Sequence, residues 1–241
     1  MLKYLQAENL KYKRTFVKKL IFIAPLVTLL YSLLSWKYFQ NCGFNFWYMA
    51  ILPGYISLMA ALTNEKEEKK LRYRAVFSLP ISLKKVWISK VLTNGIYMIL
   101  SCMVLLCGII LGGYLISSTI PILRVFAGAA LIAVTFLWQI PLCLFLAKKL
   151  GMIWTVLINL GIGSILNVLA ASTSFWWICP YSFTSRIMCP VIGILPNGLM
   201  VGNGSPLLNP VVIPIGIILS IILFFLLLIV TANWFQQQEV N

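Results

Sequence analysis

Residues 211–230 read VVIPIGIILSIILFFLLLIV, and 17 of these 20 side chains are Val, Ile, Leu or Phe. A helix of about 20 apolar residues matches the roughly 30 Å hydrocarbon layer of a bilayer. Inserting this stretch into a membrane is favourable by on the order of 5 to 10 kcal/mol. Residues 211–230 are therefore predicted to form a transmembrane helix.

The rest of the chain has the same character. Of its 241 residues, 61% are hydrophobic and 10% are charged, whereas soluble domains carry about 25% charged residues. We predict an all-α, polytopic membrane protein, with residues 1–241 forming a single transmembrane domain. Its six predicted spans are Leu20–Tyr38, Phe46–Thr63, Val91–Ile116, Ile122–Ala147, Met152–Ala171 and Val211–Trp234.

The positive charges indicate how these spans are oriented. The net charge is +14, and sixteen of the nineteen Lys and Arg residues lie in segments 1–19, 64–90 and 148–149. Because Lys and Arg in short loops stay on the cytoplasmic side, these segments and both termini are predicted to be cytoplasmic. The hydropathy assigns the excess positive charge to membrane lipids rather than to nucleic acid.

The amino-terminal segment, residues 1–19, mixes cations with Leu and Tyr side chains. This pattern favours a helix lying in the inner headgroup layer. A simple basic flank of the first span is the alternative, and the sequence does not decide between them.

The residue inventory excludes most catalytic chemistry. The chain has no His and no Asp, and its five acids are Glu8, Glu65, Glu67, Glu68 and Glu239. A membrane-embedded enzyme would need a nucleophile with a base, or a metal site, so we predict no catalytic residues, no metal and no cofactor. The G-x-x-x-x-G-K-[ST] motif is also absent, so any ATP that powers the protein must bind a partner chain.

Segment 64–90 is the largest polar region. Asn64 is predicted to cap a short charged helix that begins with Glu65, Glu67 and Glu68, and Ser82 is predicted to cap a second helix. Such a helix suits docking to a cytosolic partner. The alternative is a solvated loop that only fixes the topology.

Segment 172–210 is predicted to be extracytoplasmic. Its candidate substrate contacts are Trp176, Trp177, Tyr181 and Arg186, although an aromatic belt at the bilayer surface explains the tryptophans equally well. The apolar run Pro190–Met200 is too short to span and predicts a re-entrant or surface-lying helix. Whether Cys179 and Cys189 form a disulfide stays open.

The uncharged polar side chains of Asn94, Gln139, Asn159 and Asn167 lie within the predicted spans. Such side chains usually hydrogen-bond between helices, and Gly161-x-Gly163 with Ser164 permits close helix approach. No ionisable side chain is predicted at the middle of the membrane, so an ion-coupled carrier is disfavoured.

Three motifs carry a resemblance to a known family. They are MLKYLQAENLKYKRTF (residues 1–16) followed by Lys18-Lys19-Leu20, Ser78-Leu79-Pro80-Ile81-Ser82 with Lys90, and Trp177-x-x-Pro180. With these, the chain resembles the permease subunits of ABC-2 type exporters, in particular the lantibiotic immunity permeases of the mutacin and epidermin type.

The resemblance implies a half-transporter of the bacterial cell membrane that pairs with a second permease subunit and two copies of a cytosolic ABC ATPase. It also implies export of an antimicrobial lanthionine-containing peptide for self-immunity. Fit to the ATPase would then depend on Glu65, Glu67, Glu68, Arg72 and Arg74. An alternative is a non-transporting immunity protein that binds or sequesters the peptide. The sequence names neither the peptide nor the composition of the permease pair.

Overall fold

The structure is a computed structural model that describes residues 1–13, 15–71 and 82–240, with side chains described for residues 1–13, 15–65 and 82–238. Within these residues the chain is helical, and its only β pairing is an isolated bridge between Ile194 and Met200. In this described part of the chain, four helical stretches are long and apolar enough to cross a membrane, and a fifth is added when two helices meeting at 40° count as one. The all-α prediction is confirmed, and the apolar helices fit a multi-pass membrane protein.

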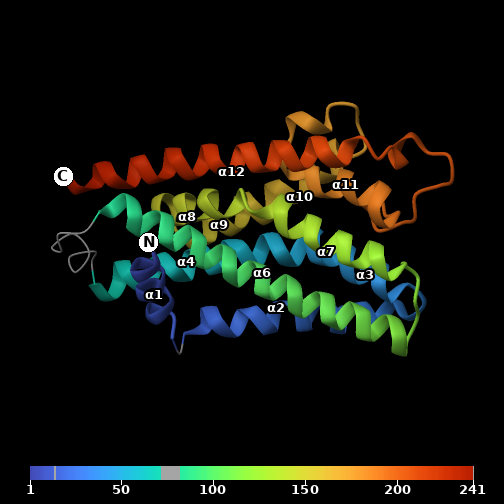
Figure 1. Cartoon of the computed structure of the whole chain (residues 1–241), viewed down its shortest axis with the longest axis horizontal. Coiled ribbons are helices and arrows are strands. Elements are labelled where there is room, and N and C mark those ends of the chain that lie inside the picture. Colours follow the sequence, from blue (N-terminus) through green and yellow to red (C-terminus); the bar gives the residue numbers. More distant parts are fainter. Residues whose placement is uncertain (14, 72–81, 241) are drawn as a thin grey trace.

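The helices pack lengthwise into a bundle (Figure 1). The first half contains α1 (Leu2–Lys11), α2 (Phe16–Ser32), the 3-10 segment η1 (Leu33–Tyr38), α3 (Phe39–Phe46), the π-helical turn η2 (Trp47–Ile51) and α4 (Leu52–Leu71). The second half contains α6 (Leu83–Leu115), α7 (Ile122–Phe136), α8 (Gln139–Leu150), α9 (Met152–Val156), the π-helical turn η3 (Leu157–Ile162), α10 (Gly163–Ala170), η4 (Trp176–Ile178), η5 (Pro180–Ser182), α11 (Phe183–Ile192), η6 (Pro206–Leu208), α12 (Val212–Gln236) and η7 (Gln237–Val240).

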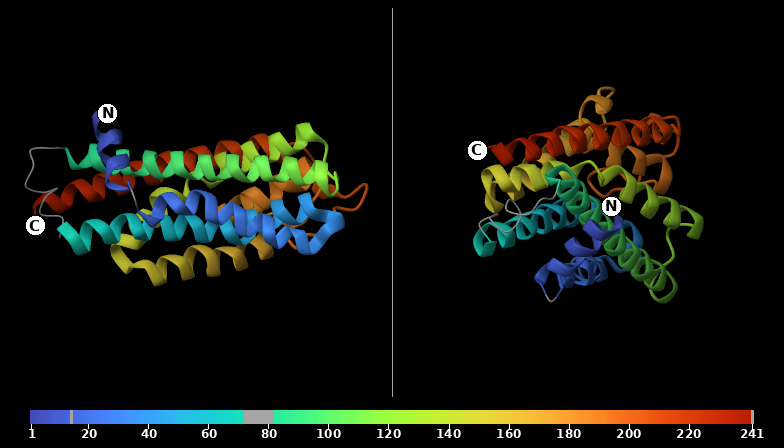
Figure 2. Two further views of the ribbon diagram at one scale, coloured as in Figure 1. Left: turned by 90° about the horizontal axis from the view of Figure 1, so that it is seen from below. Right: turned by 60° about the vertical axis from the view of Figure 1, so that its left-hand side comes forward.

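The first long helical stretch, Phe16–Glu65, reverses its direction. Ser35 has non-helical dihedral angles, φ −106° and ψ 53°, and it breaks the stretch inside η1. After this break, α3 and α4 return alongside α2 (Figure 1; Figure 2, left). Both chain termini lie at the same end of the bundle.

A proline in α2 leaves one backbone carbonyl without its helical donor. Pro25 has no N–H to give to the carbonyl of Ile21, four residues earlier. The Ser101 hydroxyl of α6 donates to that carbonyl instead, at 3.0 Å. A neighbouring helix thus satisfies the group that the proline frees.

Pro53 at the start of α4 repeats the arrangement. The carbonyl of Met49, four residues before it, accepts a hydrogen bond from the Ser164 hydroxyl of α10 at 3.0 Å. Within the predicted span Phe46–Thr63, the helix α4 continues through Pro53 and Gly54. In a low-dielectric environment this replacement hydrogen bond stabilises the helix.

We expect Ser101→Ala and Ser164→Ala each to lower the free energy of unfolding by about 1 kcal/mol, because each removes the hydroxyl that replaces a missing proline N–H. Denaturant titration of the purified protein in detergent measures this change. Ser220→Ala is the matched control, since the buried Ser220 hydroxyl donates only to the Gly216 carbonyl of its own helix. Equal losses at all three positions would contradict the explanation.

The predicted span Ile122–Ala147 is bent. It consists of α7 and α8, which meet at an angle of 40° around Leu137 and Trp138. Pro141 lies in the first turn of α8, where its missing N–H is tolerated, but it cannot donate to the Leu137 carbonyl in a continuous helix. The bend therefore falls just before this proline.

A short helix from the segment between α10 and α12 enters the bundle. Nearly every residue of α11 is buried, and the helix packs against α7 and α12 (Figure 1). The prediction of a helix at Pro190–Met200 placed it too late, since α11 ends at Ile192 and is followed by Gly193, whose φ is +74°. The apolar residues that follow form a loop in which Ile194 is fully buried, so their hydrophobicity reflects packing rather than a helix.

Candidate functional site

The end of the bundle that holds both termini contains a buried polar cluster centred on Asn64. The Asn64 side chain of α4 donates to the Leu144 carbonyl of α8 at 2.8 Å and accepts from Lys90 Nζ of α6 at 3.2 Å. Asn94 donates to the Lys90 carbonyl at 2.9 Å and accepts from the Thr63 hydroxyl at 3.3 Å. We call Thr63, Asn64, Lys90 and Asn94 the Asn64 hub; all four are buried.

Aromatic rings and a lysine join this end of α6 and α8 to α12. The ring centroids of Trp87 and Phe235 are 4.7 Å apart, and Trp87 Nε1 donates to the Thr231 hydroxyl at 2.9 Å. Lys148 Nζ lies 4.1 Å from the Phe235 centroid and 5.5 Å from that of Trp234. Cation–π attraction at such distances stabilises contacts that are shielded from water. We call Trp87, Lys148, Trp234 and Phe235 the aromatic clamp.

The helix α1 is fastened to α6 at the same end. Glu8 is buried, pairs with Lys11 and accepts a hydrogen bond from the Tyr12 hydroxyl at 3.0 Å. Tyr97 of α6 donates to Asn9 Oδ1 at 2.6 Å, and its ring meets that of Tyr12 edge to face. Figure 1 shows α1 lying across the bundle axis. Residues 2–11 thus form a packed helix rather than an unstructured basic flank.

Asn64 does not cap a helix, so this prediction was wrong. The helix α4 runs without interruption from Leu52 to Leu71, and Asn64 lies inside it. Its amide makes contacts between helices, and a buried amide with such partners does not need a helix terminus. The prediction for Ser82 is confirmed: Ser82 precedes α6, and its hydroxyl accepts from the Lys85 N–H at 3.4 Å.

The predicted ATPase-coupling residues lie at or beyond the end of α4. Glu65 is half-buried. The backbones of Glu67 and Glu68 belong to α4, but their side chains lie outside the described residues, as do Arg72 and Arg74. The structure therefore shows the helix α4, which leads into residues 72–74. The contacts of these residues with an ATPase stay predictions.

The two predicted tryptophan contacts point into different environments. Trp176 is buried, and its ring packs edge to face on Phe183 of α11 at 6.1 Å between centroids. Trp177 is 52% exposed. A role in a lipid-facing aromatic belt fits Trp177, whereas Trp176 has a packing role.

Tyr181 and Arg186 are also engaged in packing. Tyr181 meets Trp138 edge to face at 5.0 Å, and burial raises the pKa of its phenol above the usual range. Arg186 is buried in α11 and donates to the Leu207 carbonyl at 2.6 Å. Tyr181 thus holds segment 172–210 against the bundle, and Arg186 joins two parts of that segment. Neither residue joins Trp177 on an exposed surface.

The disulfide left open by the sequence does not form in the structure. Cys179 and Cys189 are free thiols: Cys179 Sγ donates to the Leu166 carbonyl at 3.9 Å, and Cys189 Sγ donates to the Ser185 carbonyl at 3.4 Å. Burial raises the pKa of the Cys189 thiol, and the nearby Arg186 only partly opposes this. A buried, protonated thiol is unreactive.

The polar residues predicted to join the spans do so. Asn159 in η3 donates to Gln139 Oε1 of α8 at 2.9 Å and to the Ser57 hydroxyl of α4 at 3.1 Å. Asn94 joins α6 to α4 within the Asn64 hub, and Asn167 donates to the Met49 sulfur at 3.1 Å. This confirms the prediction of hydrogen bonds between helices.

The opposite end of the bundle contains a groove that the sequence did not reveal. Its volume is about 550 Å³, within the range of about 300–1,000 Å³ typical of ligand sites. It lies between the break after α2, the helix α3 and the loop that follows α11. Its lining residues are Tyr31, Ser35, Tyr38, Asn41, Cys42, Asn45, Phe46, Asn197, Gly198, Leu199 and Met200, and we call it the Asn41 groove.

Asn45 holds the loop that forms one wall of this groove. Its amide nitrogen donates to the carbonyls of Leu195 and Pro196 at 3.3 and 3.2 Å. The loop closes on itself through the Gly198 N–H, which donates to the Leu195 carbonyl at 2.9 Å. On the other wall, the rings of Tyr31 and Phe46 stack with centroids 4.0 Å apart.

Gly198→Ala should disrupt this wall. Gly198 has φ +85°, and an added Cβ would lie 3.3 Å from Asn45 Oδ1, so the substitution should destabilise the loop by about 1 kcal/mol or more. We expect faster proteolytic cleavage in residues 195–203, measured by mass spectrometry of the digested protein. Gly202→Ala is the matched control, because Gly202 lacks a positive φ and no atom lies within 4 Å of its added Cβ. Similar cleavage of both variants would refute this role of Gly198.

Among the described residues, no group of three or more His, Cys, Asp or Glu side chains could hold a metal ion. No protein-family model, curated protein or solved structure matches the chain. The functional assignment therefore rests on the residues themselves and on their arrangement.

Two features of the site were not predicted, the buried lysine of the Asn64 hub and the Asn41 groove, although the sequence contains a signal for each. Lys90 follows Ser82, the predicted start of a helix, by about two helical turns. This spacing indicates that Lys90 lies within that helix. Asn41 and Asn45 are four residues apart, which places both amides on the same helical face. Asn41 and Asn45 lie between two predicted spans, so no helix or packing partner was predicted for the face that they share.

Proposed function

We propose that this chain is the membrane-spanning permease subunit of an ATP-driven exporter, which expels a lanthionine-containing peptide from the bacterial cell membrane and so protects the producing cell. The observation that carries the proposal is the Asn64 hub. It joins α4 and α6, the two helices on either side of residues 72–81, and also binds α8. A force applied between α4 and α6 would therefore move several helices together.

The proposed topology has six crossings. A straight helix over Phe16–Glu65 would be about 75 Å long, far more than a bilayer of about 30 Å requires, so its reversal at Ser35 fits two crossings. Counting the bent pair α7 and α8 as one crossing then gives six. An even number fits two termini at one end (Figure 1).

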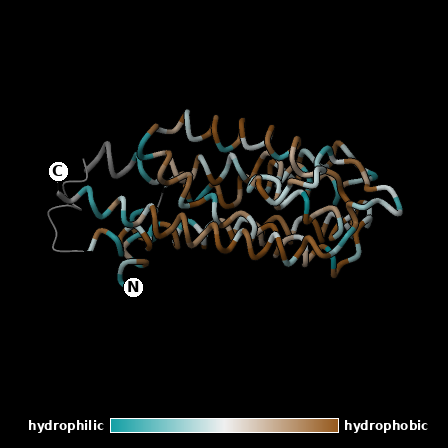
Figure 3. The backbone as a smooth tube through the Cα atoms, turned by 90° about the horizontal axis from the view of Figure 1, so that it is seen from above, coloured by the Kyte–Doolittle hydropathy of each residue, from teal (hydrophilic) through white to brown (hydrophobic). Residues whose placement is uncertain are grey.

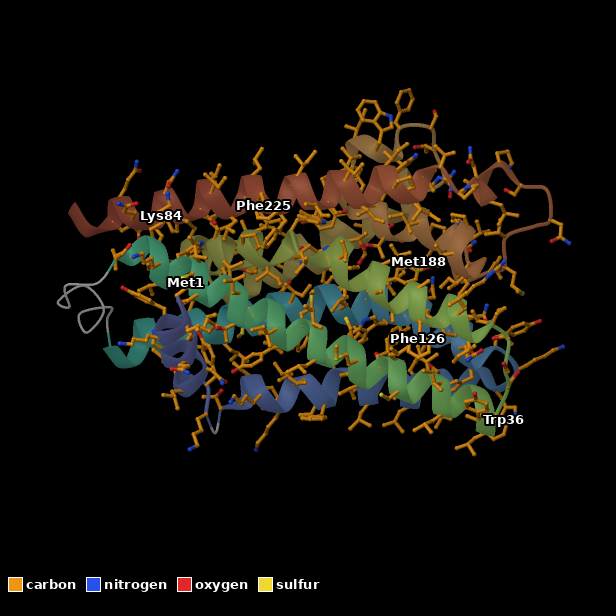
Figure 4. All side chains as sticks on the ribbon, viewed as in Figure 1. Met1, Trp36, Lys84, Phe126, Met188 and Phe225 are labelled. Atoms are coloured by element: carbon orange, nitrogen blue, oxygen red, sulfur yellow. The ribbon has the colours of Figure 1, made fainter. Side chains whose placement is uncertain are left out.

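The orientation follows from charge. Hydrophobic residues dominate the middle of the bundle in Figure 3. Figure 4 places Lys84 at the end that holds the termini and Trp36 at the opposite end. By the positive-inside rule, the Lys84 end is cytoplasmic, and α1 lies on the inner membrane surface.

The proposed mechanism requires partner chains. Cytosolic ABC ATPase subunits would bind near residues 65–74 and drive α4 and α6, and a second permease subunit would complete the transport pathway. The aromatic clamp would pass the movement from α6 and α8 to α12. In segment 64–90, Glu65, Glu67 and Glu68 are the only acidic residues of the sequence, and the other charged residues there are Lys and Arg.

The charge reversal Glu67→Lys with Glu68→Lys tests this coupling. We expect peptide tolerance to fall to the level of cells that lack the chain, and the ATPase to be lost on purification, while the variant still inserts into the membrane. Glu239→Lys in the carboxyl-terminal tail is the matched control. If cells with the double variant tolerate the peptide as well as before, the coupling proposal is contradicted.

Inactivating the partner ATPase separates export from sequestration. An exporter fails to protect the cell once the ATPase cannot hydrolyse ATP, even though its permease is present at the normal level. A sequestering protein still protects. Protection that survives ATPase inactivation would therefore replace the export proposal with the sequestering alternative.

A further inference from the structure

The Asn41 groove contains a buried donor with no acceptor. Asn41 is 2% exposed, and its Oδ1 accepts from the Thr119 hydroxyl. Among the residues described, its Nδ2 has no hydrogen-bond partner. An unsatisfied buried donor is unfavourable, so a ligand acceptor that reaches Asn41 Nδ2 would bind favourably.

The residues that line the groove indicate which kind of ligand acceptor it can bind. None of its eleven residues is charged, so a phosphate or carboxylate would have no cation to pair with. Tyr31, Tyr38, Phe46 and Met200 offer aromatic and thioether surface for an apolar side chain. A peptide carbonyl next to an apolar side chain meets both requirements: it is an uncharged acceptor with an apolar neighbour.

We infer that the Asn41 groove binds an uncharged, apolar segment of a peptide, with a backbone carbonyl of that segment accepting from Asn41 Nδ2. The inference rests on the proposed function and assigns the peptide a binding site on this chain. It also replaces the predicted contacts in segment 172–186, most of which pack inside the protein. The groove lies at the end opposite the Asn64 hub, where a peptide leaving the outer leaflet would be released.

Cys42 supplies a reporter within the groove, because it lines the groove and is partly exposed. In a Cys107→Ser, Cys179→Ser background, the remaining cysteines are Cys102, Cys143 and Cys189, and all three are buried. Alkylation by N-ethylmaleimide then reports on Cys42. The experiment uses the complex with its ATPase, purified in detergent, and epidermin as the probe peptide.

We expect epidermin to slow the alkylation of Cys42 and to stimulate ATP hydrolysis. Asn41→Ala should raise the epidermin concentration for half-protection by about tenfold, as expected for one lost hydrogen bond. Ser35→Phe fills the groove without altering Asn41 and should abolish protection. Trp36→Ala is the matched control: Trp36 is adjacent in sequence, 64% exposed and not part of the lining. Thermal unfolding confirms that each variant is folded.

The outcomes separate the two proposals. If epidermin stimulates ATP hydrolysis but does not protect Cys42, the groove assignment is overturned and the exporter proposal is retained. The same conclusion follows if the folded Asn41→Ala and Ser35→Phe variants bind epidermin normally. Absence of both stimulation and cellular protection overturns the proposed function together with this inference. Protection of Cys42 by phosphatidylglycerol vesicles without peptide would assign the groove to lipid and overturn the peptide assignment.

Discussion

Asn64→Leu should lower the free energy of unfolding by about 2–4 kcal/mol, because it removes an acceptor from a buried lysine and a donor from a buried carbonyl. The leucine is similar in size, so the packing volume is preserved. Lys90 Nζ would lose the 3.2 Å contact with Oδ1, and the Leu144 carbonyl would lose its 2.8 Å donor. Thermal or denaturant unfolding in detergent measures this loss.

Asn233→Leu is the matched control for this substitution. Asn233 lies on α12 and is exposed, so its replacement removes no buried partner. We expect its unfolding midpoint to stay close to that of the unaltered protein. If Asn64→Leu were equally neutral, the Asn64 hub would not be a structural link between α4, α6 and α8, and the coupling mechanism would lose its physical basis.

The positions of the long apolar helices could be predicted because the free energy of inserting a helix into a membrane depends mainly on composition over about 20 residues. The predicted span Met152–Ala171, for example, corresponds to α9, η3 and α10, which cover Met152–Ala170. The same average hides local breaks. The π-helical turn around Asn159 depends on partners from α4 and α8, which hydropathy does not represent.

Residues 39–45 belong to the helix α3, although no helix was predicted there. They are polar enough to look like a loop, but Gln40 Oε1 accepts from the backbone N–H groups of Thr119 and Ile120, both at 2.9 Å. These hydrogen bonds join segments about 80 residues apart. The Asn41 groove is built on this helix, so it could not be located before these long-range contacts were known.

The glycines give a second case: close packing was predicted at Gly161-x-Gly163, and it is found at one glycine of that pair and also at Gly108 and Gly112 of α6. Of the pair Gly161-x-Gly163, only Gly163 is tightly packed: an added Cβ would lie 2.6 Å from the Tyr181 ring, whereas nothing lies within 4 Å of Gly161. The motif Gly108-x-x-x-Gly112 in α6 makes closer contacts with α2 and α3. Its spacing is the pattern that favours close helix approach in membranes.

Gly112→Val should therefore be strongly destabilising, by about 2–3 kcal/mol, because an overpacked helix contact forces neighbouring atoms to move. A Cβ at this position would lie 2.1 Å from Cε1 of Phe39, a ring atom that cannot swing away as the end of a flexible side chain can. Gly161→Val adds the same side chain where the space is open and should change the unfolding midpoint little. Because both variants are valines in apolar helices, differences in helix propensity cancel between them. Equal midpoints would mean that α6 does not pack on α3 at Gly112, and the walls of the Asn41 groove would then lack their support.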